Sequence, residues 1–342
     1  MTASVHHTML ATIGALVGRA RVGLALVLVG TSCAATWGDA AAQTFPSKPV
    51  RLIVPFPPGG TTDTMTRVIA TELSDSLGQQ VIVDNRPGAG GTLGTEIAAK
   101  SPADGHSILL GTISTLAIAP NFYPNLGYDP VGSFAPISLI ARLPFFIFVN
   151  SSVPAQSLQD LIALARSKPG LLNFASPGNG TLHQLAGETF KKMASVDLVH
   201  VPYKGDAAAM TDLVSGQVQV MFDGLGPYRP YVQAGKLKVL AAATPRRHPQ
   251  LPEVPTAAEA GLPGYEVAAW FGFLAPKGTP AEIVSRFNAD VLRALRKSEV
   301  REALSMRAID SGGSSPDEFS ALIRDEIAKW SRAVKASGLR PN

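Results

Sequence analysis

The sequence predicts an α/β protein with two domains, and three observations carry this prediction. The chain has 342 residues, about two domains at ~150 residues each. From residue 50 onward, apolar runs of strand length alternate with amphipathic helical patterns. Two apolar runs, residues 136–149 and 265–275, are much longer than an ordinary strand. We interpret them as strands that leave one domain and enter the other, with domain boundaries near 143 and 267.

The composition excludes several classes of protein. Charged residues make up 16% and apolar residues 46% of the chain, which excludes wholesale disorder. The net charge is only +4 and forms no basic run, so no nucleic-acid partner is indicated. Cys33 is the only cysteine, which excludes an internal disulfide and a multi-cysteine zinc site.

The N-terminus has the pattern of a secretory signal peptide over residues 1–42. Arg19 and Arg21 precede an apolar stretch at 22–30, and a tail of small residues ends at Ala42. The apolar stretch is far shorter than the ~20 residues of a membrane span. We therefore expect export to the periplasm. Lipid attachment at Cys33 is the alternative, but Gly30 is an unfavourable residue at the start of a lipobox.

The first elements of the mature chain alternate between strand and helix. Residues 50–56 form an apolar, β-branched strand that ends in a run of proline and glycine. A helix should follow from residue 61, with Gly78 at its C-terminus. Further strands are expected at 81–83 and 107–110, separated by a short helix near 92–100. Near-continuous apolar strands separated by helices predict a parallel sheet covered on both faces.

The middle of the chain repeats this alternation, and two long helices close it. The predicted middle helices are 158–167, 181–194 and 207–215, and the predicted strands are 172–175, 199–201, 218–222 and 237–242. Capping boxes with proline at the first helical position are expected to start the two closing helices, at residues 279–282 and 315–318.

Catalytic and cofactor motifs are missing from the sequence. There is no nucleophile elbow, Walker loop or His-Glu-x-x-His motif, and the four histidines of the mature chain are widely separated. The glycine-rich segment 88–94 has Leu93 where a dinucleotide fingerprint needs glycine. We therefore predict no catalytic residue, no metal site and no cofactor, and thus no enzyme.

Two glycine-rich turns, residues 55–63 and 175–183, each follow a predicted strand and open a helix. The free N–H groups and partial positive charge of a helix N-terminus attract an anion by about 0.3–1 kcal/mol. Two such ends facing across a cleft would hold a small anion without an arginine. The alternative is ordinary capping, in which Thr61 or Thr62, and Asn179 or Thr181, satisfy their own helices.

From Phe45 to the last helix, the chain resembles the solute receptors of tripartite tricarboxylate transporters, the Bug family. The similar segments include residues 46–51, 54–60, 84–91, 134–138, 200–205, 252–256, 263–266 and 275–280. The resemblance implies a type II periplasmic binding protein fold, with two α/β lobes joined by crossover strands and a ligand cleft between them. Lobe 1 would then comprise residues 43–143 and 267–342, and lobe 2 residues 144–266.

The resemblance also implies a ligand and its binding residues. The ligand would be a small carboxylate: a di- or tricarboxylate, an aromatic acid or an acidic amino acid. From lobe 1 we expect contacts from Phe56, Gly60, Thr61, Asp63, Thr112 and Ser114; from lobe 2, from Ser176, Gly180, Thr181, His183, Tyr203 and Asp223. Two aromatic pairs, Phe145-Phe146 and Trp270-Phe271, either wall the cleft or belong to the hinge and core.

Two roles are compatible with such a site. A monomeric receptor would deliver the carboxylate to a membrane permease, as the resemblance implies. Alternatively, a periplasmic sensor would present the bound carboxylate to a signalling kinase.

Overall fold

The computed structural model describes residues 45–123 and 125–337 of the protein. The predicted signal peptide, including Cys33, lies outside the described residues. Residues from Phe45 onward form one compact unit. Within the described part of the chain, no helix combines the length and apolar character needed to span a membrane.

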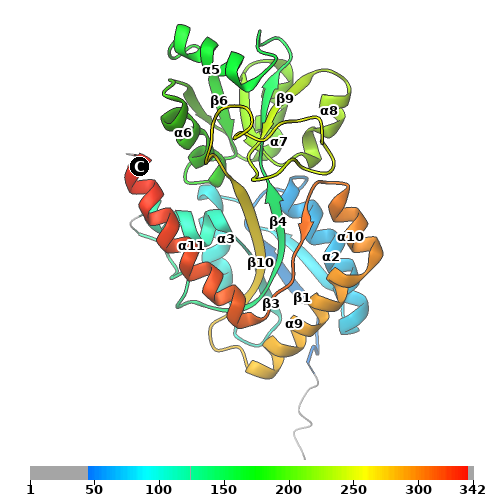
Figure 1. The fold of residues 1–342 in the computed structure, drawn as a ribbon. Helices are drawn as coiled ribbons and strands as arrows, with labels where there is room; N and C mark the ends of the chain where they lie inside the picture. The colour runs from blue at the N-terminus through cyan, green and yellow to red at the C-terminus, as the bar shows by residue number, and fades with distance from the viewer. Residues whose placement is uncertain (1–44, 124, 338–342) are drawn as a thin grey trace, which may run out of the picture. The chain divides into compact units, whose positions relative to one another are not determined.

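The first sheet has six strands in the order β11-β4-β10-β3-β1-β2. Its strands are β1 (Val50–Val54), β2 (Val81–Asn85), β3 (Ser107–Thr112), β4 (Phe134–Pro144), β10 (Ala268–Pro276) and β11 (Asp310–Ser311). β1 pairs in parallel with β2 and β3, whereas β10 is antiparallel to both β3 and β4. β4 and β10 lie side by side over almost their whole length (Figure 1).

The helices that belong with this sheet come from both ends of the chain. They are α2 (Thr61–Leu77), α3 (Thr92–Ala99), α4 (Ala119–Phe122), α9 (Ala281–Arg296), α10 (Ser298–Ser305) and α11 (Pro316–Ser337), with short turns η1 (Ala89–Gly91) and η2 (Ser114–Ile118). In α2, apolar residues at a spacing of four, such as Met65 and Ile69, are completely buried, and Gly78 ends the helix in the left-handed conformation at φ 66°. Both features were expected from the sequence.

The second sheet has five strands in the order β7-β6-β8-β5-β9. They are β5 (Phe146–Asn150), β6 (Asn173–Ser176), β7 (Val199–Pro202), β8 (Val220–Asp223) and β9 (Leu237–Ala242). The helices of this region are α5 (Leu158–Ser167), α6 (Leu182–Ala194), α7 (Asp206–Ser215) and α8 (Arg229–Gln233), with the turn η3 (Gly226–Tyr228). β6 is parallel to β7 and β8, and β5 is antiparallel to β8 and β9.

The prediction of a parallel sheet was therefore only partly correct, because both sheets are mixed. β4, β5 and β10 are as apolar as the parallel strands since they are buried on both faces, and burial does not report strand direction. The run 136–149 is also two strands rather than one. At Phe145 the backbone N–H bonds to Val267 and the carbonyl to Ala243, so the chain changes from one sheet to the other there.

The helix starts test the predicted capping boxes directly. At α11, the Glu318 N–H bonds to Ser315 Oγ and the Ser315 N–H to Glu318 Oε2, so this capping box is confirmed. The box predicted at 279–282 was wrong. α9 begins at Ala281 with Pro280 as its N-cap, and the Thr279 hydroxyl instead donates to the Pro276 carbonyl. A capping box that the sequence analysis did not identify starts α5.

Candidate functional site

One pocket lies where the N-termini of α2 and α6 meet the ends of several strands. It is lined by the turn after β1, the residues after β3, the ends of β4 and β8, the start of β10 and the starts of α6 and α7. Its empty space is about 450 Å³, part of which is open to solvent.

The N-terminus of α2 has no side-chain cap. Gly60 is its N-cap residue, and neither Thr61 nor Thr62 accepts a capping hydrogen bond. Thr62 is 7% exposed, and its Oγ1 is buried without a hydrogen-bond partner. Both threonines line the pocket. Ordinary capping of this helix by Thr61 or Thr62 is therefore wrong, and the first-turn N–H groups have no intrahelical acceptor.

Asp63 supports this turn instead of facing the pocket. Its Oδ2 accepts a hydrogen bond from the Gly59 N–H at 3.0 Å, and its Oδ1 pairs with Arg67 Nη2 at 2.9 Å. Burial alone would raise the pKa of Asp63, but the hydrogen bonds from Arg67 and Gly59 lower it below its ordinary value. The carboxylate is thus ionised and fixes the glycine turn on the end of α2.

The N-terminus of α6 is also without a side-chain cap. Its N-cap residue, Thr181, donates its hydroxyl to the Gly178 carbonyl at 2.8 Å. The Leu182 N–H donates to Ser114 Oγ at 3.0 Å. Ser114 is the first residue of η2, which follows strand β3 of the first sheet. A second bond of this kind joins Tyr123 Oη to the Asn179 carbonyl at 3.0 Å. These bonds hold the start of α6 against the edge of the first sheet.

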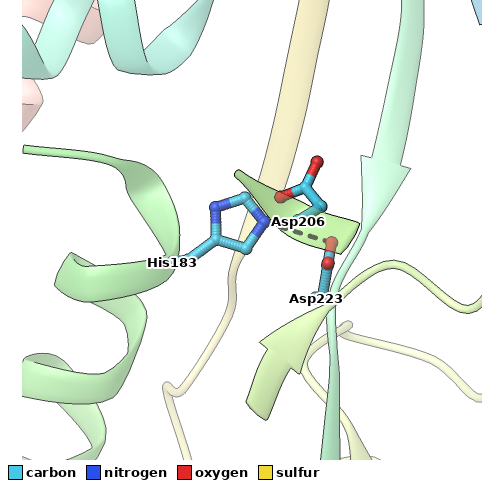
Figure 2. A group of neighbouring side chains, drawn as sticks. All are labelled: His183, Asp206 and Asp223. Carbon is cyan, nitrogen blue, oxygen red and sulfur yellow. Dashed lines mark ion pairs between the residues drawn. The ribbon is translucent and has the colours of Figure 1, made fainter. Parts of the chain in front are cut away.

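Three titratable side chains of the pocket lining lie close together. Figure 2 shows His183 at the start of α6, Asp206 at the start of α7 and Asp223 at the end of β8. Their ligating atoms all lie within 4.8 Å of one another, which makes them, among the described residues, the group able to surround a metal ion. His183 Nε2 and Asp223 Oδ1 form an ion pair at 3.1 Å.

The hydrogen bonds of this cluster are unevenly distributed. Asp223 Oδ1 also accepts from the Gly224 N–H at 2.6 Å, and its Oδ2 accepts from Tyr228 Oη at 3.0 Å. In contrast, His183 Nδ1 and Asp206 Oδ1 are buried and have no hydrogen-bond partner. Asp223 is therefore satisfied within the protein, whereas Asp206 is not.

The electrostatics follow from burial and from the two carboxylates. Burial opposes protonation of His183, but the Asp223 carboxylate outweighs it and raises the pKa of His183 above its ordinary value. Burial, together with the Asp223 charge, raises the pKa of Asp206 to about 6, although His183 acts in the opposite direction. No lysine or arginine lines the pocket. The Asp223 carboxylate thus favours the protonated form of His183.

Seven of the twelve residues that the sequence analysis selected line this pocket: Phe56, Thr61, Thr112, Ser114, Thr181, His183 and Asp223. The other five, Gly60, Asp63, Ser176, Gly180 and Tyr203, do not. Ser176 Oγ bonds to His200 Nε2, the Gly180 N–H bonds to Gln184 Oε1, and Tyr203 Oη donates to Asp212. Direct ligand contacts by these five stay predictions.

The aromatic pairs divide between the two alternatives. Phe145 and Phe271 line the pocket. Phe146 instead packs on Phe148, and Trp270 packs edge-on against Phe319 of α11. Each crossover strand thus gives one ring to the pocket and one to the core, since adjacent strand residues point to opposite faces.

The sequence analysis missed Asp206 and Thr62. Asp206 follows Gly205 at the end of a strand-to-glycine-to-helix segment, the same pattern that selected the other two turns. This third turn was a signal that could have been used. The Asp206 side chain can approach the start of α2 closely because residue 60 is glycine: a Cβ atom there would lie 2.9 Å from Asp206 Oδ2.

The sequence profile of the tripartite tricarboxylate transporter family receptors matches residues 65–339 of this chain. The chain belongs to this family. BugT of Bordetella pertussis is 35% identical over 318 residues, covering 93% of this chain and 98% of its own. The family consists of solute receptors and not of enzymes, in agreement with the absence of catalytic motifs from the sequence.

Solved structures of similar proteins have the same fold. A protein of Rhodopseudomonas palustris solved with adipate is 40% identical, with a TM-score of 0.84 over 87% of this chain and all of that one. MatC of the same organism, solved with bound malate, is 36% identical, with a TM-score of 0.81 over 85% of this chain and all of that one. The receptor is therefore a two-lobed periplasmic binding protein, as the resemblance implied.

Proposed function

We propose that this receptor binds a small carboxylate in the pocket between α2 and α6 and delivers it to the membrane permease of a tripartite tricarboxylate transporter. The observation that carries the proposal is the convergence on one pocket of two helix N-termini whose own N-cap residues make no side-chain capping bond. Thr61 and Thr62 add hydroxyl groups at the start of α2. Free N–H groups and hydroxyls are the donors that a carboxylate accepts from.

The interaction free energy that two helix N-termini offer an anion is large enough for binding of a small ligand. A partly buried helix N-terminus can contribute up to about 2 kcal/mol toward an anion, so two ends offer up to about 4 kcal/mol before other contacts are counted. Apolar contacts with Phe145 and Phe271 would add to this. Adipate in the Rhodopseudomonas palustris relative and malate in MatC support a carboxylate as the ligand class.

We further propose that the lobes divide as the sequence predicts, at 143 and 267, and that ligand binding couples to their closure. The change of sheet at Phe145 supports the first boundary, and the start of β10 at Ala268 supports the second. The Ser114–Leu182 and Tyr123–Asn179 hydrogen bonds would form as the lobes close. Residues 1–42 would direct the chain to the periplasm and then be removed.

A thermal-shift screen tests carboxylate binding. The protein would be purified from the periplasm and melted with C3–C8 mono- and dicarboxylates, aromatic acids and acidic amino acids, each beside its amide. An acid present at ~100 times its Kd stabilises by about 2.7 kcal/mol, a shift of several degrees. We expect a shift from an acid and none from its amide. An amide that shifts the Tm as much as its acid would refute the proposal.

A further inference from the structure

The charge of the pocket does not suit a dicarboxylate. Its lining includes Asp206 and Asp223 and no lysine or arginine. The one basic side chain, His183, is already ion-paired with Asp223 at 3.1 Å. The lining therefore has one acidic side chain more than it has basic ones. A ligand dianion would place two more negative charges in the same small volume, at a distance where like charges repel.

Asp206 also has an unmet need for a hydrogen-bond donor. Its Oδ1 is buried, and no group of the protein donates to it. Buried carboxylate oxygens are almost always hydrogen-bonded, because leaving one unpaired is costly. The residue lies at the first position of α7 and reaches across to Gly60 at the start of α2. A hydrogen-bond donor to Asp206 Oδ1 would therefore lie where the start of α7 approaches the start of α2.

The other members of the cluster indicate which donor fits. Both oxygens of Asp223 are occupied, by His183 and Gly224 on Oδ1 and by Tyr228 on Oδ2. His183 Nε2 is directed to Asp223, so a metal ion could reach that nitrogen only by breaking the ion pair. A metal ion held by all three residues is therefore disfavoured, and a hydrogen-bonding cation on Asp206 is favoured.

Two further unpartnered atoms complete the pattern. Thr62 Oγ1, on a side chain that is more than nine-tenths buried, and His183 Nδ1 both lack hydrogen-bond partners at this pocket. The Thr62 hydroxyl is a free donor, and in its protonated form, which Asp223 favours, His183 offers a second donor at Nδ1. The pocket thus combines hydrogen-bond donors for a carboxylate with one unpartnered carboxylate oxygen, Asp206 Oδ1.

We propose that the ligand is an amino-carboxylate, with its ammonium group on Asp206 and its carboxylate on the start of α2, near Thr62 and His183. This inference rests on the proposed function, since it specifies which carboxylates the site prefers. An ammonium group supplies Asp206 with both a donor and a compensating charge, whereas a hydroxyl supplies only the donor. The preference should therefore rank amino acid above hydroxy acid above plain diacid.

Two series of acids that differ only at C2 test this ranking. They are aspartate, malate and succinate, and glutamate, 2-hydroxyglutarate and glutarate, each measured by isothermal titration calorimetry on the full mature protein. In at least one series we expect the amino acid to bind ~30-fold or more tightly than the plain diacid, the lower end of the effect of one buried charged hydrogen-bond partner.

Variants then assign the effect to Asp206. Asp206→Asn should reduce the preference for the amino acid to within about threefold, while Asp206→Glu, which keeps the charge, should retain part of it. Asp197→Asn is the matched control, because Asp197 is a highly exposed aspartate that does not line the pocket. It should leave the preference unchanged. Melting curves of each variant check that it folds.

The possible outcomes separate the two proposals. If a plain diacid or hydroxy acid binds as tightly as its amino analogue, the inference fails and carboxylate binding stands. If EDTA abolishes binding, a metal ion and not an ammonium group occupies the site at Asp206, and the inference fails. If 1,4-diaminobutane binds as tightly as the amino acids, the cation site stands and carboxylate recognition fails. If no compound of either series binds while another acid of the thermal-shift screen does, the inference fails and carboxylate binding stands; if no acid of that screen binds either, both proposals fail.

Discussion

Replacing Asp206 by asparagine should stabilise the ligand-free receptor at neutral pH. The folded protein raises the pKa of this carboxyl to about 6 from its ordinary value of 3.8, because of burial and the nearby Asp223 charge. The folded state therefore binds more protons than the unfolded state between these two values, and stability falls as the pH rises through that window. Asp223 and His183 are the titratable groups that act on it.

The magnitude follows from the two pKa values. Above pH 6 the full shift applies, and about two pKa units at 1.36 kcal/mol each correspond to about 3 kcal/mol. At pH 4, close to the ordinary pKa of the carboxyl, the same relation leaves only a small fraction of this. Loss of an acidic residue from the first turn of α7 subtracts about 0.3–1 kcal/mol. We therefore expect Asp206→Asn to gain about 2 kcal/mol at pH 7.5 and almost nothing at pH 4.

Urea denaturation of the ligand-free protein at both pH values measures this difference. In a thermal melt, the same gain of about 2 kcal/mol would raise the Tm by roughly 3 °C for a protein of ~300 residues. Asp197→Asn, at an exposed position outside the pocket, is the control and should change stability little at either pH. A variant that is destabilised at pH 7.5, or that gains equally at pH 4, would refute the electrostatic reasoning.

Three further changes have expected outcomes. Ser114→Ala removes the acceptor of the Leu182 N–H and should weaken ligand binding by about 1 kcal/mol in calorimetry, since that bond holds α6 at the pocket; unchanged affinity would show that it is not used in the bound state. Thr62→Val removes a hydroxyl without a partner, so stability in urea should be retained while acid affinity falls by about 1 kcal/mol; equal affinities would exclude a Thr62 contact. Ser315→Ala breaks the capping box with Glu318 and should cost about 1 kcal/mol of stability with no effect on binding, and a change in ligand affinity would contradict this separation.

Much of the fold could be predicted from the sequence because its elements have local causes. The spacing of Met65 and Ile69 and the position of Gly78 predicted α2, and the strand at 237–242 and the helix at 158–167 have the predicted bounds. The glycine-rich turns before α2 and α6 were likewise visible, because a strand, a glycine turn and a helix start follow one another along the chain.

Strand direction and the break at Phe145 could not be predicted in the same way. A strand buried on both faces has the same apolar pattern whether its neighbours are parallel or antiparallel. The carbonyl of Phe145 accepts a hydrogen bond from Ala243, 98 positions away in the chain, and no local pattern encodes such a partner. The wrong cap at Thr279 has a similar reason, since its hydroxyl found a different acceptor in the preceding strand.

The binding pocket likewise combines features that are local in the sequence with features that depend on the fold. The local pattern of residues indicated which segments place a glycine-rich turn before a helix start, because the glycines, the threonines and the helical periodicity are all local. The approach of His183, Asp206 and Asp223, from α6, α7 and β8, results instead from the tertiary fold (Figure 2). Their approach depends on the strand order of the second sheet and on packing across Gly60. The anion-binding ends are thus local features of the chain, whereas the unpaired carboxylate beside them is a product of the fold.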